Sequence, residues 1–252
     1  MFKAFIFSIL LSLSACSGNA VNTKSANPRD YQIGAYLWYQ YSGEFRALCY
    51  QAYNLGRYKL DLDLENKHNR KRAVVFDIDE TVLDNSFGGA YEIKNHMAWD
   101  KENLSRWVKQ IRAEAIPGAK EFIEYAISKN IEVIYISNRS VAQIEDTFLN
   151  LQRLGIPAKK ENFYFYTNES SKETRRREVL KKYDVVLFFG DNLADFDTEW
   201  DNKTNEERTA SVGGRREDFG DKFIILPNPL YGDWENSIPK NKSREEFLKT
   251  EH

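Results

Sequence analysis

Residues 73–81 read Ala-Val-Val-Phe-Asp-Ile-Asp-Glu-Thr, an apolar run that becomes acidic in a single step. The apolar half, with β-branched Val74 and Val75, predicts a short buried strand. In an extended chain the two carboxylates that follow, Asp77 and Asp79, point to the same side. Two crowded like charges need a cation or a shared proton, and Mg²⁺ prefers such oxygen ligands. Taken alone, the stretch is equally well explained as an acidic turn capped by Thr81.

An alternation of strands and helices extends outward from this stretch. Residues 131–136, 163–166, 185–189 and 223–226 predict further strands, and residues 119–129, 141–154 and 171–182 predict helices. Apolar strands separated by helices are typical of a parallel sheet covered on both faces. The sequence therefore predicts an α/β fold with a Rossmann-like parallel sheet flanked by helices. Helical periodicity also occupies residues 30–63, ahead of a charged loop at residues 65–72.

Polar residues follow three of the predicted strands. Asp77, Ser137 and Asp191 each lie where a strand ends, and open α/β sheets bind ligands at that edge. We expect Ser137 at a helix start, where free N–H groups favour a phosphate, a role compatible with capping that helix. Lys172 offers a compact charge for phosphoryl oxygens, or is one lysine on a solvated helix face. Asp195 would support the site, or is a helix N-terminal charge stabilised by the dipole.

Four motifs in this order resemble those of the haloacid dehalogenase superfamily. They are Asp77-Ile-Asp-Glu-Thr81, Ile136-Ser-Asn-Arg139, Lys172 and Gly190-Asp-Asn-Leu-Ala-Asp195. The resemblance implies that Asp77 is the nucleophile and forms an aspartyl-phosphate, while Asp79 protonates the leaving oxygen and then activates water. Because Asp79 must carry a proton when the alcohol leaves, we expect the best activity on the acid side of neutrality. The implied phosphate-binding residues are Ser137, Asn138 and Lys172.

The same resemblance implies one cofactor, Mg²⁺. Its ligands would be Asp77, Asp191 and the backbone carbonyl of Asp79, with Asp195 holding a metal-bound water or orienting Lys172.

The first residues predict export. Lys3 precedes an apolar run over residues 5–13, too short to span a bilayer, and Leu13-Ser-Ala-Cys16 resembles a bacterial lipobox. We therefore expect a signal peptide over residues 1–15, a membrane anchor on a lipidated Cys16, and a flexible tether over residues 16–29. Ser17 after the cysteine favours the outer membrane, so the expected location is the bacterial outer membrane or periplasm.

Three stretches narrow the resemblance to the class C bacterial acid phosphatases, the lipoprotein e group. They are the lipobox, the Asp77 motif and residues 226–235, which read Leu-Pro-Asn-Pro-Leu-Tyr-Gly-Asp-Trp-Glu. The resemblance implies a broad phosphomonoesterase that prefers nucleoside 5′-monophosphates, with homodimers common. It also implies one phosphatase domain over residues 30–252, with a core at about 70–226 and a smaller helical part from residues 30–65 and 227–252.

One position departs from the group. Members often place an aromatic residue three positions before Trp107, where it stacks on a base opposite the residue that corresponds to Tyr231. Leu104 stands there in this chain, with Trp99 as the nearby substitute. A stacked base is worth roughly 1–3 kcal/mol, so losing one aromatic face would raise KM. Tyr231 remains the implied base-binding residue, although many tyrosines in this chain serve core packing.

Composition excludes several other functions. The formal net charge is -2, from 36 basic and 38 acidic side chains, so no basic field would gather nucleic acid. With 3 histidines and no Gly-x-Ser-x-Gly or Walker A stretch, the chain lacks the marks of histidine phosphatases, serine hydrolases and P-loop kinases. One alternative stays open, a surface lipoprotein that binds a nucleotide or haem with little turnover. The intact set of Asp77, Asp79, Lys172 and Asp191 favours turnover of a small phosphomonoester, because a pure binding protein needs neither a nucleophile nor an acid.

Overall fold

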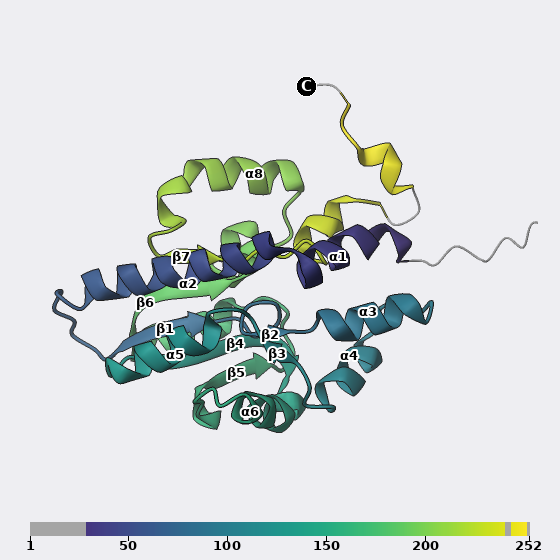
Figure 1. The fold of residues 1–252 in the computed structure, drawn as a ribbon. Coiled ribbons are helices and arrows are strands. Elements are labelled where there is room, and N and C mark those ends of the chain that lie inside the picture. Colours follow the sequence, from purple (N-terminus) through teal and green to yellow (C-terminus); the bar gives the residue numbers. More distant parts are fainter. Residues whose placement is uncertain (1–28, 240–242, 251–252) are drawn as a thin grey trace, which may run out of the picture.

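The computed structural model describes residues 29–239 and 243–250 and centres on a five-stranded parallel sheet. The strand order is β5-β4-β1-β6-β7, with β1 in the middle (Figure 1). The strands are β1 (Arg72–Phe76), β4 (Glu132–Ser140), β5 (Phe163–Tyr166), β6 (Asp184–Gly190) and β7 (Phe223–Ile225), and each neighbouring pair is parallel. The α/β prediction is confirmed, and all five strands are found near their predicted positions, although β4 continues four residues beyond its predicted end at Ile136.

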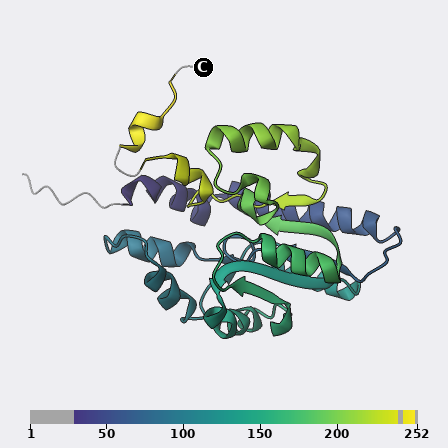
Figure 2. The same cartoon turned by 180° about the vertical axis from the view of Figure 1, so that it is seen from behind.

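Helices cover both faces of the sheet (Figures 1 and 2). The first face carries α2 (Gly43–Asp63), α5 (Ala119–Ser128) and α6 (Ile144–Arg153), and the second carries α7 (Glu173–Lys182) and α8 (Asn205–Gly214). Side chains of β1 alternate between the two cores, with Val74 and Phe76 in the first and Ala73 and Val75 in the second. Because β1 is buried on both faces, its carboxyl end is held rigidly.

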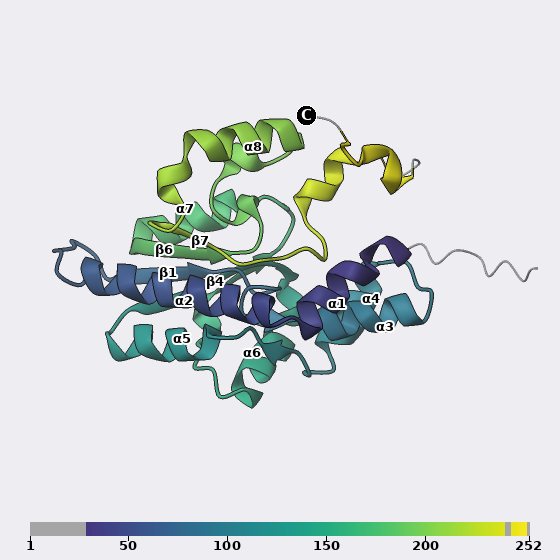
Figure 3. The same cartoon turned by 45° about the horizontal axis from the view of Figure 1, so that its top comes forward.

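A smaller helical part lies beyond that end of the sheet. It contains α1 (Ile33–Tyr41), α3 (Ser86–Lys94), α4 (Lys101–Val108) and the short ladder of β2 (Leu83–Asp84) with β3 (Glu114–Ala115). In this part α1 packs against α3 (Figure 3). The sequence predicts helices here from the terminal segments alone. The longer N-terminal helix, α2, instead lies along the sheet, and the described C-terminal segment forms 3-10 turns at Asp233–Ser237 and Arg244–Phe247.

Three helices, α3, α4 and α8, lie outside the predicted set. Gly88 and Gly89 lie inside α3, and glycine costs a helix about 1 kcal/mol relative to alanine. Tertiary packing explains Gly89, because a Cβ there would lie 2.0 Å from the Tyr36 hydroxyl. Close contact with α1 therefore requires glycine at position 89, although glycine is unfavourable within a helix.

Part of the predicted organisation falls outside the described residues. The signal peptide, Cys16 and nearly all of the tether belong to residues 1–28. Within the described part of the chain, no helix combines the length and apolar character needed to cross a membrane.

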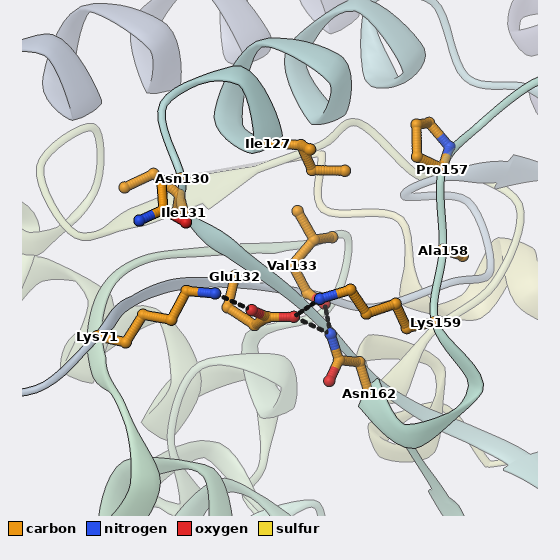
Figure 4. A pocket seen from close by; sticks show the side chains of 10 residues that line it. All are labelled: Lys71, Ile127, Asn130, Ile131, Glu132, Val133, Pro157, Ala158, Lys159 and Asn162. Atoms are coloured by element: carbon orange, nitrogen blue, oxygen red, sulfur yellow. Dashed lines mark hydrogen bonds and ion pairs between the residues drawn. The ribbon is translucent and has the colours of Figure 1, made fainter.

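At the amino end of the sheet, a pocket surrounds the buried carboxylate of Glu132 (Figure 4). Its Oε1 accepts hydrogen bonds from Lys159 Nζ at 2.9 Å and Asn162 Nδ2 at 2.6 Å, and Lys71 bonds to Oε2. Burial raises the pKa of this carboxyl, but the hydrogen bonds from Lys71, Asn162 and Lys159 outweigh burial and lower the pKa to about 2. Each of these donors is engaged by the carboxylate, so we interpret the cluster as structural.

We predict that Glu132→Gln lowers the free energy of unfolding by about 1.5–3 kcal/mol at pH 7, the range for hydrogen bonds to a charged group. The folded pKa lies below the ordinary value of 4.5, so the stabilisation is present above about pH 4.5 and is lost as the pH falls toward 2. Urea unfolding at pH 7 and pH 3 measures the difference. Glu145→Gln, at an exposed ion pair with Lys160, should cost less than about 0.5 kcal/mol. A Glu132→Gln loss of equal size at both pH values would contradict this account.

Candidate active site

The acidic stretch after β1 turns back sharply at the carboxyl edge of the sheet. The Asp77 N–H donates to the Phe189 carbonyl of β6 at 2.9 Å, which continues the ladder by one residue. Glu80 then adopts a left-handed backbone conformation with φ 55°, uncommon for a residue other than glycine. Its buried carboxyl accepts a hydrogen bond from the Asn85 N–H at 2.8 Å. The turn is therefore closed by a side chain from within the motif itself.

Three carboxylates meet at this edge. Asp77 follows β1, Asp191 follows the neighbouring β6, and Asp195 ends the 3-10 turn at Leu193–Asp195; each offers an oxygen within 4.8 Å of the other two. Lys172 Nζ lies 2.6 Å from Asp77 Oδ1 and 2.6 Å from Asp195 Oδ1. The sequence predicted a shared location for all four residues, and the structure brings them together.

Burial and crowding perturb the titration of these groups. Burial, with the nearby charges of Asp195 and Asp79, raises the pKa of Asp77 to about 7, although Lys172 opposes the rise. The pKa of Asp191 is raised well above its ordinary value by burial and by Asp195 and Asp77. Burial alone would lower the pKa of Lys172, but Asp195 and Asp77 raise it. When all three carboxyl groups are ionised, they exceed the single ammonium group by two negative charges, which suits a divalent cation.

Neighbouring residues fix the orientation of the two carboxylates that flank Asp77. Thr81 Oγ1 donates to Asp191 Oδ1 at 3.1 Å, and Asn228 Nδ2 donates to Asp191 Oδ2 at 2.7 Å. Gly190 makes room for Asp195, because a Cβ on Gly190 would lie 2.5 Å from Asp195 Cβ. The late stretch around Asn228 thus reaches the site, as the implied role of Tyr231 requires, although the bond from Asn228 to Asp191 was not predicted.

Asp79 lies apart from the carboxylate cluster. Its Oδ1 accepts hydrogen bonds from Arg139 Nε at 2.9 Å, Arg139 Nη2 at 2.8 Å and Asn85 Nδ2 at 2.8 Å. The cluster contains Asp195 in addition to the expected Asp77 and Asp191, while the side chain of Asp79 is held elsewhere. Arg139 and Asn85 were not predicted as site residues. Arg139 could have been found, because it ends the second motif.

The second motif differs from the prediction in its backbone. We expected Ser137 at a helix start, and this is wrong: β4 continues to Ser140, which caps the 3-10 turn at Val141–Gln143. The strand continues because its pairing with β5 resumes after a register shift between Ser137 and Ser140. Ser137 is fully buried and its Oγ accepts from the Arg139 N–H at 3.1 Å. Asn138, on the irregular part of β4, is exposed and accepts a hydrogen bond from Arg175 Nη2 at 2.7 Å.

The residues expected to contact a base have accessible rings. Tyr231, three positions beyond Asn228, is 38% exposed, and Trp99, just before α4, is 57% exposed. Leu104 lies within α4 and is half-buried. An aromatic face is therefore available on each of two segments, with Trp99 as the exposed ring nearest in sequence to Leu104.

Comparisons with known proteins agree with this geometry. Residues 10–234 match the model of the HAD superfamily, subfamily IIIB (acid phosphatase). A class B acid phosphatase of Rahnella sp. is 26% identical over 192 residues, which cover 71% of this chain and 76% of that protein.

Two solved structures of the class C acid phosphatase from Bacillus anthracis are similar in fold. The one with tungstate bound has a TM-score of 0.84 and 42% identity, and covers 89% of this chain and 99% of its own. The other has a TM-score of 0.85 and 41% identity, and covers 90% of this chain and 100% of its own.

Proposed function

This chain belongs to the acid phosphatases of HAD subfamily IIIB, and we therefore propose that it hydrolyses phosphomonoesters through an aspartyl-phosphate on Asp77. One observation carries the proposal. Asp77 is bridged to Lys172 at 2.6 Å inside a carboxylate cluster, while Asp79 lies outside that cluster with its own partners. Two carboxylates with separate environments suit two roles, a nucleophile and a proton donor. The tungstate bound by the Bacillus anthracis enzyme, a tetrahedral oxyanion like phosphate, supports the same interpretation.

The proposed reaction has two displacements at phosphorus. A carboxylate oxygen of Asp77 bonds to phosphorus as the ester P–O bond breaks, and the electron pair leaves with the alcohol oxygen, which takes a proton from Asp79. Asp79 then takes a proton from water as the water oxygen bonds to phosphorus and the bond to Asp77 breaks. Inorganic phosphate leaves, and both carboxyl groups return to their starting states. Lys172 contributes a positive charge beside the phosphoryl oxygens throughout.

We propose Mg²⁺ as the divalent metal of this site. The proposed ligands are carboxylate oxygens of Asp77 and Asp191, which are hard ligands, and the backbone carbonyl of Asp79. Asp195, whose oxygens accept hydrogen bonds from Lys172 Nζ and the Asn192 N–H, would orient Lys172 or hold a metal-bound water. When bound, the ion would neutralise charge on the transferring phosphoryl group. The residues themselves orient the nucleophile and hold Lys172 against it.

For the substrate, we propose nucleoside 5′-monophosphates, with the base against Tyr231 and Trp99. The exposed rings and the similarity to a class C acid phosphatase support this choice.

We also propose that the protein belongs to the class C lipoprotein group, forms homodimers, and is anchored through Cys16 at the outer membrane or in the periplasm. Cys16→Ser should then move the protein from the detergent phase to the aqueous phase, and unchanged partition would refute the anchor. No comparison supports the alternative of a binding lipoprotein with little turnover.

Phosphate release from a panel of phosphomonoesters tests the proposed function. The panel contains nucleoside 5′- and 3′-monophosphates, sugar phosphates and phosphotyrosine, each assayed at pH 5 and pH 8 with Mg²⁺ or with excess chelator. We expect the highest kcat/KM for 5′-monophosphates at pH 5. We also expect that chelation abolishes turnover and that added Mg²⁺ restores it. Full activity after exhaustive chelation would refute the metal proposal. Equal kcat/KM for 5′-monophosphates and sugar phosphates would refute the nucleotide preference.

A further inference from the structure

We propose that Arg139 and Asn85 are positioning residues that hold Asp79 by one oxygen and present its other oxygen to the leaving group. This inference rests on the proposed role of Asp79 as the proton donor. All three hydrogen bonds to Asp79 end on Oδ1, at 2.8–2.9 Å. Within the part of the chain that the structure describes, Oδ2 accepts no hydrogen bond from protein. The carboxyl group is therefore fixed in rotation with one oxygen free for proton transfer.

The guanidinium of Arg139 is itself rigidly placed. Arg139 is 2% exposed, and its Nη1 donates to Thr147 Oγ1 of α6 at 2.9 Å. Its Nε and Nη2 both reach Asp79 Oδ1, a forked arrangement that the planar guanidinium favours and a lysine ammonium cannot reproduce. The hydroxyl on α6 thus sets the plane of the fork, and the fork sets the orientation of Asp79.

Asn85 joins the same carboxyl to the helical part. Its Oδ1 accepts from Arg139 Nη2 at 3.2 Å and from Trp107 Nε1 of α4 at 2.9 Å, and its backbone N–H donates to the buried Glu80 carboxyl. Asn85 is therefore a junction with neighbours on α4, on the turn after β1 and on β4. The position of Asp79 depends on α4, a helix that carries Leu104 and follows Trp99 directly.

This arrangement predicts a dependence on the leaving group. A strongly basic leaving alkoxide or phenoxide needs a proton as the P–O bond breaks, whereas p-nitrophenoxide leaves readily without one. Loss of Asp79 orientation should therefore slow esters of weakly acidic alcohols much more than p-nitrophenyl phosphate. A purely structural role for Arg139 would slow both classes of ester alike.

The test compares kcat/KM for p-nitrophenyl phosphate and phenyl phosphate, which have similar shapes and leaving groups of different basicity. This parameter reports steps up to the transfer of phosphate to Asp77, so slow hydrolysis of the intermediate does not hide the effect. For Arg139→Lys we expect a loss of at most about threefold on p-nitrophenyl phosphate and about 30-fold or more on phenyl phosphate, within the usual range for general acids. Arg216→Lys, at an exposed arginine outside the site, is the matched control.

A second variant covers the case in which Arg139→Lys fails to fold. Trp107→Phe keeps an aromatic ring beside Gly88 but removes the donor to Asn85, and should lose about threefold more on phenyl phosphate than on p-nitrophenyl phosphate. Equal losses on both esters in a folded variant would overturn the proposal.

The Asp79→Asn variant distinguishes failure of the positioning role from failure of the proposed role of Asp79 as proton donor. If Asp79→Asn lacks leaving-group dependence, Asp79 is not the proton donor; if it has that dependence and Arg139→Lys does not, only the positioning role fails.

Discussion

Replacing Asp77 by Asn should lower kcat by at least about 10⁴-fold, the scale seen when a nucleophile is removed from a catalytic unit. An amide oxygen is a poor nucleophile toward phosphorus, yet the new side chain has the same size and still accepts a hydrogen bond from Lys172. The fold should therefore survive. Because Asp77→Asn removes one of three crowded, buried carboxylates, we expect equal or greater resistance to urea at pH 7.

Two measurements make this result decisive. Rapid acid quenching and mass spectrometry of the active protein should reveal a phosphate adduct on Asp77, and the variant should lack it. The intact mass of the variant must also be checked, since deamidation of the introduced amide would regenerate the acid. Asp221→Asn, at an exposed carboxylate that pairs with Lys59, should retain wild-type kcat. Turnover near the wild-type rate in an undeamidated Asp77→Asn protein would refute the nucleophile.

Lys172→Met should have the second largest effect, on stability as well as on turnover. Lys172 is 5% exposed and is the bridge between Asp77 and Asp195, so its loss leaves two buried carboxylates without their cation. Breaking a buried ion pair costs about 3–5 kcal/mol, and we expect a loss of this order at pH 7 without metal. The raised pKa of Lys172 keeps the lysine charged across the assay range.

The pH dependence of that loss identifies its origin. The carboxyls in the variant can take up protons, so the cost of burying them should shrink as the pH falls below 7, in line with the raised pKa of Asp77. Urea unfolding at pH 7 and pH 5, with and without Mg²⁺, measures this change. Lys160→Met, at an exposed ion pair, should cost less than about 0.5 kcal/mol at either pH. A Lys172→Met loss that is independent of both pH and Mg²⁺ would indicate a packing defect.

The carboxylate cluster could be predicted from the sequence because topology brings its members together. Asp77 and Asp191 follow apolar strands, and neighbouring parallel strands end at one edge, whatever the separation along the chain. The contact between Arg139 and Asp79 could not be predicted from strand order in this way. It depends on the direction of a side chain from an irregular part of β4, and the expectation of a helix start at Ser137 obscured that geometry. Asn85 had no motif to mark it, since its role comes from contacts with Trp107 and Glu80.

The length of β4 places the Glu132 cluster, which affects stability at low pH, far from the active site. Glu132 starts this strand and Ser137 lies five residues on, about 16 Å along an extended chain. At an ionic strength of 0.1 M the Debye length is about 10 Å, so charge changes at the half-exposed Lys71 and Lys159 are largely screened from the carboxylates at the other end. The Lys71, Lys159 and Asn162 shell is thus an independent module for engineering. Its side chains can be exchanged to shift the pH at which the protein unfolds while the rate-limiting chemistry is left as it was.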